Sequence, residues 1–271
     1  DPFFHPYENH FRETLFRNTF GDDSIFEPWL PVPAERPVPA DGHWGVPVRW
    51  SERTSPTGSR VWNSPIKEEA DIAKLAVPRH AVDETATERR AARLRDAVGD
   101  IVPLWIDRGP VWQTWAADLS TNLAKLRGLE QMMWDMTDRP DWLRRLLAFM
   151  RDGVLKAQEE AEKAGDWSLG NHNNQAMPYA EELPDPAPEG YGVPRKKLWV
   201  FCASQETTLV GPAMFEEFML AYQRPIIERF GLASYGCCED LTRKIPVLRK
   251  IANLRRIAVA PVANVAACAE Q

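Results

Sequence analysis

The sequence has no surplus of basic charge and no long apolar run. Its 33 Lys and Arg residues are outnumbered by 39 Asp and Glu residues, so the formal charge is −6 and non-specific binding to nucleic-acid phosphates is disfavoured. No stretch approaches the roughly 18 uncharged apolar residues that a membrane span requires. The amino-terminal residues also lack the basic start and apolar centre of a signal peptide. We therefore expect a cytoplasmic protein that binds neither nucleic acid nor a membrane.

Cysteines and glycine-rich motifs are scarce as well. The four cysteines, Cys202, Cys237, Cys238 and Cys268, are too few for a disulfide scaffold in a chain of this length, so we expect reduced thiols. No GxGxxG or GxxxxGK run follows an expected strand, which disfavours nucleotide binding. Because the chain begins with Asp and stops inside an apparent helix with no capping Gly or Asn, it is typical of an internal fragment.

Residues 1–65 form a segment of unusual composition. The segment is rich in Pro, Trp, Phe and His and contains the run FEPWLPVP at 26–33. Proline and glycine interrupt regular structure, so few helices or strands are expected here. We predict that residues 1–65 are an irregular segment that packs on a second unit formed by residues 66–271.

Three stretches in the middle of the chain have the pattern of helices. Residues 85–98 are charged and rich in Ala. Between residues 126 and 136 apolar side chains recur at steps of three and four, which indicates a helix with one buried face. A longer amphipathic helix is predicted from Asp138, as N-cap with Pro140 close behind, to Gly165. Its apolar stripe consists of Leu143, Leu146, Leu147, Met150 and Val154.

The last part of the chain alternates short strands with helices. Residues 197–203, 232–237 and 256–260 have the composition of strands, and helices are expected between them, among them one over 241–252. Strands separated by whole helices pair in parallel, which indicates an α/β fold, either an open sheet or a (β/α)8 TIM barrel. Because no nucleotide-binding glycine motif follows these strands, the barrel is favoured.

Polar side chains follow two of these strands, at the ends where a parallel barrel carries its functional groups. Gln205 and Glu206 follow the first strand, and Cys237, Cys238 and Glu239 follow the second. Thiolate and carboxylate groups are accepted zinc ligands, so the second cluster is a candidate Zn²⁺ site. The alternative for the thiols is burial as small hydrophobes. The alternative for Glu206 is an ion pair in the barrel wall rather than a ligand or a general acid/base.

Residues 168–184 form a loop that a barrel would place over its mouth. Amide, imidazole and phenol groups are concentrated there, and they can hydrogen-bond a small-molecule substrate. A solvated polar loop is the alternative. The candidate substrate-binding residues are Asn171, His172, Asn173, Asn174 and Tyr179.

Five phrases, in this order along the chain, resemble the uroporphyrinogen decarboxylase superfamily, in particular its uncharacterised bacterial members near the corrinoid-dependent methyltransferase branch. The resemblance implies a (β/α)8 barrel, incomplete at its carboxyl-terminal end, and agrees with the strand spacing. The phrases are GLEQMMWDMTDRPDWL (128–143), SQET (204–207), PAMFEEFMLAYQ (212–223), FGLASYGCCEDL (230–241) and NLRRIAVAPVANV (253–265).

The methyltransferase branch has a His-x-Cys zinc pair at the second strand end. By that match Tyr235 stands in the place of the His and Cys237 in the place of the Cys, so Cys238 or Glu239 would substitute, with a further ligand beyond Gln271. The resemblance therefore implies a zinc-dependent enzyme that moves a methyl group to or from a corrinoid carried by a partner protein. The catalytic residues expected are Gln205 and Glu206, from their place at a strand end, and Tyr235.

Two other functions remain open. True uroporphyrinogen decarboxylases, which act in tetrapyrrole (heme) biosynthesis, carry an RQAGR-like run near the amino terminus, and none occurs here. A substrate with many carboxylates needs converging Arg or Lys side chains, and the strand-end residues named above are neutral or acidic, so carboxy-lyase activity is disfavoured. The second alternative is a non-catalytic barrel that serves as a binding protein, since fold does not fix function.

Overall fold

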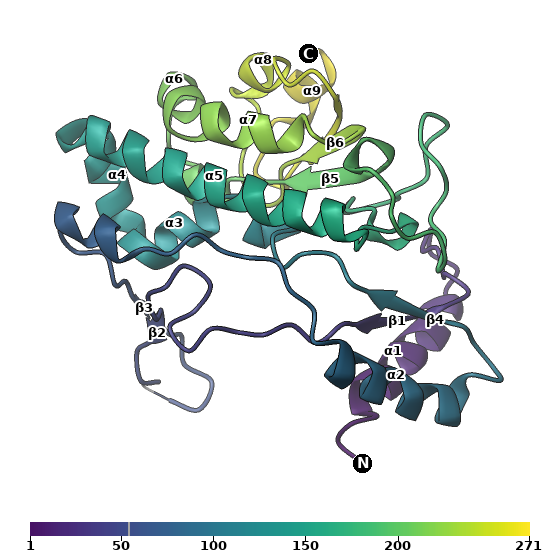
Figure 1. Cartoon of the computed structure of the whole chain (residues 1–271). Helices are drawn as coiled ribbons and strands as arrows, with labels where there is room; N and C mark the ends of the chain where they lie inside the picture. Colours follow the sequence, from purple (N-terminus) through teal and green to yellow (C-terminus); the bar gives the residue numbers. More distant parts are fainter. Residues whose placement is uncertain (54) are drawn as a thin grey trace.

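The computed structural model describes residues 1–53 and 55–271, which form a mixed structure of helices and short strands (Figure 1). Within these ranges no helix is both long and apolar enough to cross a bilayer. The α-helices are α1 (His5–Asn18), α2 (Glu84–Val98), α3 (Ser120–Arg127), α4 (Leu129–Asp138), α5 (Pro140–Ala164), α6 (Pro212–Phe215), α7 (Ala221–Ile227), α8 (Ile245–Leu248) and α9 (Val265–Ala269). The strands are β1 (Leu30–Pro33), β2 (Arg49–Trp50), β3 (Trp62–Asn63), β4 (Leu104–Asp107), β5 (Trp199–Cys202), β6 (Leu232–Tyr235) and β7 (Leu254–Ile257). Short 3-10 helices are η1 (Glu69–Lys74), η2 (Thr114–Ala116), η3 (Leu169–Asn171), η4 (Arg195–Lys197) and η5 (Gln205–Thr207), and η6 (Glu216–Leu220) is a π-helical turn.

Strands β5, β6 and β7 are neighbours in one parallel sheet. The register runs from Trp199 opposite Leu232 to Cys202 opposite Tyr235. All four residues of β5 are buried, as expected for a parallel strand that is covered on both faces. The parallel pairing predicted from strand spacing is confirmed, although β7 begins before the predicted residue 256.

A second parallel pair joins β1 to β4, with Leu30 opposite Leu104. Strand β1 lies inside residues 1–65, so the amino-terminal segment contributes a strand rather than only packing on other elements. The strands of the described ranges form three separate sheets, and no closed barrel is detected among them. The α/β class therefore holds, and the barrel stays a prediction.

The expectation of little regular structure before residue 65 is wrong for α1. Residues 5–18 precede the proline-rich run, and the only proline of this helix, Pro6, sits in its first turn, where no backbone N–H is needed. Tyr7 is buried with Leu30, Val32 and Leu94 in a small separate core. Figure 1 shows α1 and α2 beside β1 and β4, so these two helices cover the small core.

The middle helices follow their predicted patterns closely. The five stripe residues of α5 are fully buried, and Gly165 ends the helix in the left-handed conformation with φ +77°, as glycine favours. Asp138 ends α4 instead of capping α5, whose N-cap position is Arg139. The helix expected over 241–252 is reduced to α8, because Pro246 fits only the first turn of a helix.

Candidate functional site

The carboxyl ends of β5 and β6 are tied together by the side chain of Glu239. Its Oε1 accepts a hydrogen bond from the backbone N–H of Ser204 and its Oε2 accepts one from Cys237, both at 2.8 Å. Glu239 is only 1% exposed. Gly236, at φ +99°, turns the chain just before this point, and a Cβ there would collide with Leu241. Local backbone geometry and a buried carboxylate therefore fix the loop after β6.

A pair of acidic side chains lies at this end of the sheet. Ser120 donates a hydrogen bond to Glu206 Oε2 at 2.7 Å, and Thr121 Oγ1 lies 2.8 Å from Glu206 Oε1 and 3.2 Å from Asp118 Oδ2. The Thr121 backbone N–H also donates to Asp118 Oδ1 at 3.2 Å. One hydroxyl group thus bridges a fully buried carboxyl group and a half-exposed one.

Asp118 is an acid in an environment that favours its neutral form. Burial raises the pKa of Asp118 well above its ordinary value, and the negative charge of Glu206 raises it further, against smaller effects of Thr121 and Lys125. A protonated carboxylic acid can donate a hydrogen bond to Thr121, whose hydroxyl then donates to Glu206. The arrangement is therefore a short relay from a buried proton to an accessible carboxylate.

The residue after Asp118 is conformationally strained. Leu119 has φ +67° and ψ −40°, a region that non-glycine residues rarely adopt, and its side chain is fully buried. Gln223 holds the same turn, because its Nε2 donates to the Asp118 carbonyl oxygen at 2.5 Å and to that of Ala203 at 2.9 Å. Strain of this kind is tolerated where surrounding contacts determine the backbone, and such positions cluster at functional sites.

Tyr235 lies beneath this cluster, away from solvent. The side chain is fully buried, and its hydroxyl donates to Gln223 Oε1 at 2.7 Å. Burial raises the pKa of this phenol. In the structure Tyr235 positions Gln223 and, through it, the Asp118 turn. Its predicted catalytic role stays a prediction.

The two adjacent thiols lie past the end of β6, where the sequence places them. Cys238 is exposed, Cys237 is half-buried, and their Sγ atoms are 3.3 Å apart. Burial raises the pKa of Cys237. Both carboxylate oxygens of Glu239 accept hydrogen bonds from backbone N–H groups, and the predicted zinc-ligand roles of Cys237, Cys238 and Glu239 stay predictions. Among the residues that the structure describes, no group of three or more His, Cys, Asp or Glu side chains is placed to hold a metal ion.

The loop over 168–184 does not bring its five candidate residues into one pocket. His172 lines a cavity of about 320 Å³, together with Trp29 and Trp105, whereas Asn174 and Tyr179 line another of about 570 Å³. The His172 Nδ1 accepts a hydrogen bond from the Trp199 N–H at 3.1 Å, and burial lowers the pKa of His172 to about 4.

The remaining loop candidates are held by other side chains. Asn174 accepts a hydrogen bond from Arg256 at 2.5 Å, and Tyr179 donates to Glu27. Asn173 donates to Gln113 at 2.9 Å. These contacts fix the loop to neighbouring elements, and substrate binding by its residues stays a prediction.

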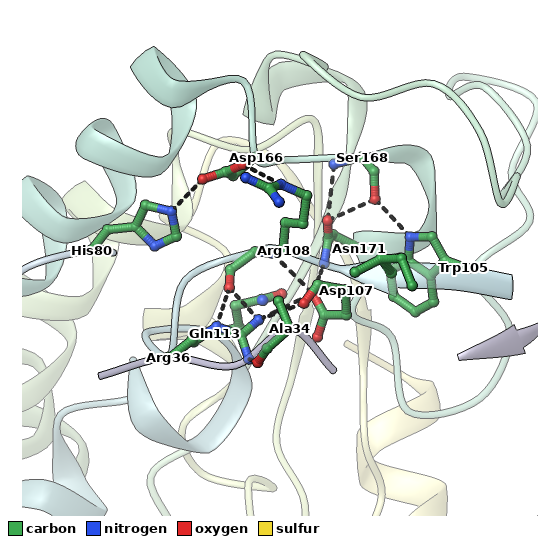
Figure 2. A network of polar contacts seen from close by, with 12 residues as sticks. Ala34, Arg36, His80, Trp105, Asp107, Arg108, Gln113, Asp166, Ser168 and Asn171 are labelled. Carbon is green, nitrogen blue, oxygen red and sulfur yellow. Dashed lines mark hydrogen bonds and ion pairs between the residues drawn. The ribbon is translucent and has the colours of Figure 1, made fainter. Parts of the chain in front are cut away.

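A second polar network, which the sequence analysis missed, lies at the carboxyl ends of β1 and β4 (Figure 2). Arg36 donates to the carbonyl oxygens of Asp107 and Gly109, and Asn171 donates to Asp107 Oδ1 at 2.8 Å. Strand ends carry function in parallel sheets. Asp107, the last residue of β4, and Arg108 after it could therefore have been named as candidate site residues by the same argument that was used for β5 and β6.

Figure 2 also shows His80, Arg108 and Asp166 pointing toward one another. His80 Nε2 lies 2.7 Å from Asp166 Oδ2, and Arg108 Nε donates to Asp166 Oδ1 at 2.6 Å. The other two guanidinium nitrogens of Arg108 donate to Glu84. This group links the loop before α2, the end of β4 and the segment after α5, so its evident role is to hold those elements together.

Comparison with known proteins adds no identification. No profile of a known protein family matches the chain, and no curated protein matches it. The resemblance to the uroporphyrinogen decarboxylase superfamily is therefore carried by the sequence phrases alone.

Proposed function

We propose that the chain belongs to a (β/α)8-barrel enzyme of the uroporphyrinogen decarboxylase superfamily that transfers a methyl group from an ether or amine to a corrinoid. The observation that carries the proposal is the pair Asp118 and Glu206, bridged by Thr121 at the carboxyl end of a parallel sheet. Parallel pairing of β5 with β6, β6 with β7 and β1 with β4 supports the barrel. The active sites of such barrels lie at this end of the strands.

The acid pair suits a reaction in which a heteroatom leaves. When the carbon–oxygen or carbon–nitrogen bond to the methyl group breaks, the bonding electrons stay on the heteroatom, which then needs a proton. Asp118 passes its proton through the Thr121 hydroxyl to the carboxylate of Glu206, which is half-exposed at the sheet edge and delivers the proton to the heteroatom. Asp118 regains a proton from solvent by the reverse route between turnovers. A corrinoid carried by a partner protein supplies the acceptor for the methyl group.

Zinc is not needed for this proton transfer, and no step is assigned to it. Two soft thiol ligands are present at Cys237 and Cys238. The carboxylate of Glu239 beside them accepts hydrogen bonds from the backbone N–H groups of Ser204 and Cys237. A zinc ion at the two thiols stays a prediction, which metal analysis of the purified protein tests.

Decarboxylation of a polycarboxylate is less well supported, because the two arginines at the carboxyl ends of β1 and β4 already bind acceptors of the protein. Arg36 uses its three nitrogens on the carbonyl oxygens of Ala34, Asp107 and Gly109. Arg108 uses all three of its nitrogens on Asp166 and Glu84. Both guanidinium groups are therefore engaged by acceptors of the protein, among them the buried carboxylate of Asp166, and binding a substrate carboxylate instead would leave those acceptors without these hydrogen bonds.

The proposal is tested by adding the purified protein to a reduced corrinoid-carrying protein and a panel of O-methyl and N-methyl compounds. Methyl transfer is followed by the absorption spectrum of the corrinoid. We expect Glu206→Gln to lower the rate by about 100-fold or more, since general acid catalysis contributes about that much. Glu88→Gln, on the surface of α2, is the matched control and should retain the rate.

Two results would overturn the proposal. One is the absence of methyl transfer to the corrinoid from every compound in the panel. The other is stoichiometric conversion of uroporphyrinogen to coproporphyrinogen at ordinary enzyme concentration, which would establish the decarboxylase instead.

A further inference from the structure

The adjacent thiols after β6 are arranged to react with each other. Cys237 Sγ and Cys238 Sγ are 3.3 Å apart, and a disulfide bond is about 2.05 Å long. An approach of about 1.3 Å would therefore join them. Cys238 is exposed and Cys237 is half-buried, so a reagent in solution meets Cys238 first and Cys237 stands behind it.

The backbone on both sides keeps the pair in place. Gly236 turns the chain at φ +99° before Cys237, and the carboxylate of Glu239 accepts the Cys237 N–H on the other side. The side chain of Gln175 hydrogen-bonds the Cys237 thiol. These contacts orient Cys237 toward its neighbour.

We propose that Cys237 and Cys238 form a redox-sensitive vicinal dithiol that closes to a disulfide on meeting a low-molecular-weight disulfide. The Cys238 thiolate attacks one sulfur of the small disulfide, whose S–S bond breaks, and one small thiol leaves with a proton. The Cys237 thiolate then attacks the Cys238 sulfur, the mixed disulfide breaks, and the second small thiol leaves with a proton. The protein loses two electrons and two protons, and the small disulfide gains them.

The disulfide between Cys237 and Cys238 is a reversible state and not a permanent cross-link. Adjacent Cα atoms are about 3.8 Å apart, which is shorter than the roughly 4.4–6.8 Å of ordinary disulfides. A strained and exposed disulfide is easily reduced and is of the labile, regulatory kind. The pair therefore senses the thiol–disulfide balance around it.

Formation of the disulfide affects the two backbone hydrogen bonds that Glu239 accepts, from Ser204 and Cys237. A ring through both side chains constrains the peptide between Cys237 and Cys238 and changes the backbone angles at Cys237, whose own N–H, in the preceding peptide, is donated to Glu239. The other oxygen of the same carboxylate holds the Ser204 N–H, directly before Gln205 and Glu206. Resting on the proposed function, we expect oxidation to lower methyl transfer several-fold, and reduction to restore it.

The chemical test does not depend on that activity. The reduced protein is incubated with glutathione disulfide, and its intact mass, its peptide map and its count of maleimide-reactive thiols in denaturant are measured. We expect the loss of two hydrogen atoms and two reactive thiols in the peptide that holds Cys237 and Cys238, reversed by dithiothreitol. Cys237→Ser should stop at the glutathione adduct on Cys238, and Cys268→Ser, on α9, should close as the wild type does.

Three outcomes would overturn the proposal. A glutathione adduct on Cys238 that persists in the wild type shows that the pair does not close. A disulfide that maps to Cys268 or Cys202 shows that another pair reacts. One zinc ion per chain in the purified protein, lost in both Cys237→Ser and Cys238→Ser, makes the thiols metal ligands. Failure of methyl transfer alone leaves the mass measurement intact and counts only against the proposed function.

Discussion

The hydroxyl of Thr121 connects the two carboxyl groups of the candidate site, Asp118 and Glu206. This hydroxyl is within hydrogen-bond distance of both Glu206 and Asp118, and with one proton it donates to only one of them at a time. Glu206 could be predicted from the sequence because it follows a strand that is recognisable by composition. Asp118 could not, because it lies in the long connection after β4, whose path depends on tertiary contacts such as that of Gln223 with the Asp118 carbonyl.

The buried acid gives a pH-dependent stability that a single substitution removes. Below the ordinary pKa of an aspartic acid, Asp118 is protonated in both the folded and the unfolded chain. As the pH rises above that value, the unfolded chain releases the proton while burial keeps it in the folded chain, so the free energy of unfolding falls. Asp118→Asn imitates the protonated acid and should gain on the wild type by up to about 1.4 kcal/mol per pH unit above about pH 4.

Urea unfolding at several pH values measures this effect. The comparison variant is Asp152→Asn, an exposed carboxylate of α5, which should follow the wild-type curve. A constant difference between Asp118→Asn and the wild type from pH 4 to about 8 would contradict a buried protonated acid.

At the scale of helices and strands, predictability followed the strength of the local pattern. The α5 stripe, its proline start and Gly165 all agree with one another, and the helix lies where they indicate. Strand β5 could be found because it is apolar on both faces. Helix α1 could not be separated from the irregular stretch behind it, since its stability comes from packing of Tyr7 against β1 and α2 rather than from a strong apolar stripe.

The connection of α3 to α4 depends on one buried ion pair. Arg127 Nε donates to Asp135 Oδ2 at 2.6 Å, its Nη1 donates to the carbonyl oxygen of Lys67, and both charged side chains are at most 2% exposed. Arg127→Met leaves Asp135 as a buried charge with its main partner removed, which costs about 3–5 kcal/mol. Chemical denaturation should show this loss.

A matched substitution at the surface shows how much of the destabilisation by Arg127→Met comes from leaving a buried charge and how much from the loss of a long side chain. Arg95→Met on α2 also breaks an ion pair, with Glu88, but both partners are half or more exposed, and such pairs contribute at most about 1 kcal/mol. Equal destabilisation by Arg95→Met and Arg127→Met would show that the burial of the pair is not what matters.

At the scale of the whole molecule, the buried apolar side chains of residues 1–53 and 55–271 form two cores of different size. The larger gathers α3, α4, α5, β5 and β6, and the smaller holds Tyr7, Leu30, Val32 and Leu94 between α1, α2, β1 and β4. The larger core could be foreseen from patterns local to its helices and strands. The smaller one could not, because β1 and β4 pair across most of the first hundred residues and proline dominates the composition of β1.

We expect the two cores to open separately. A small core with few fully buried side chains opens at a lower free energy than a large one, so amides of β1 and β4 should exchange with solvent faster than those of β5 and β6. Hydrogen exchange followed by mass spectrometry measures this difference. Equal protection of the two sheets would show a single cooperative unit.

The left-handed backbone at Leu119 also restricts how this site can drift as the sequence changes over generations. Isoleucine has about the volume of leucine and valine is one methylene smaller, but the branched Cβ of both makes a positive φ a true outlier. Glycine adopts that φ freely but would leave a cavity where a fully buried side chain now lies. Few of the simple replacements therefore keep both the turn and the core. We expect position 119 to stay leucine for as long as the turn that carries Asp118 is kept.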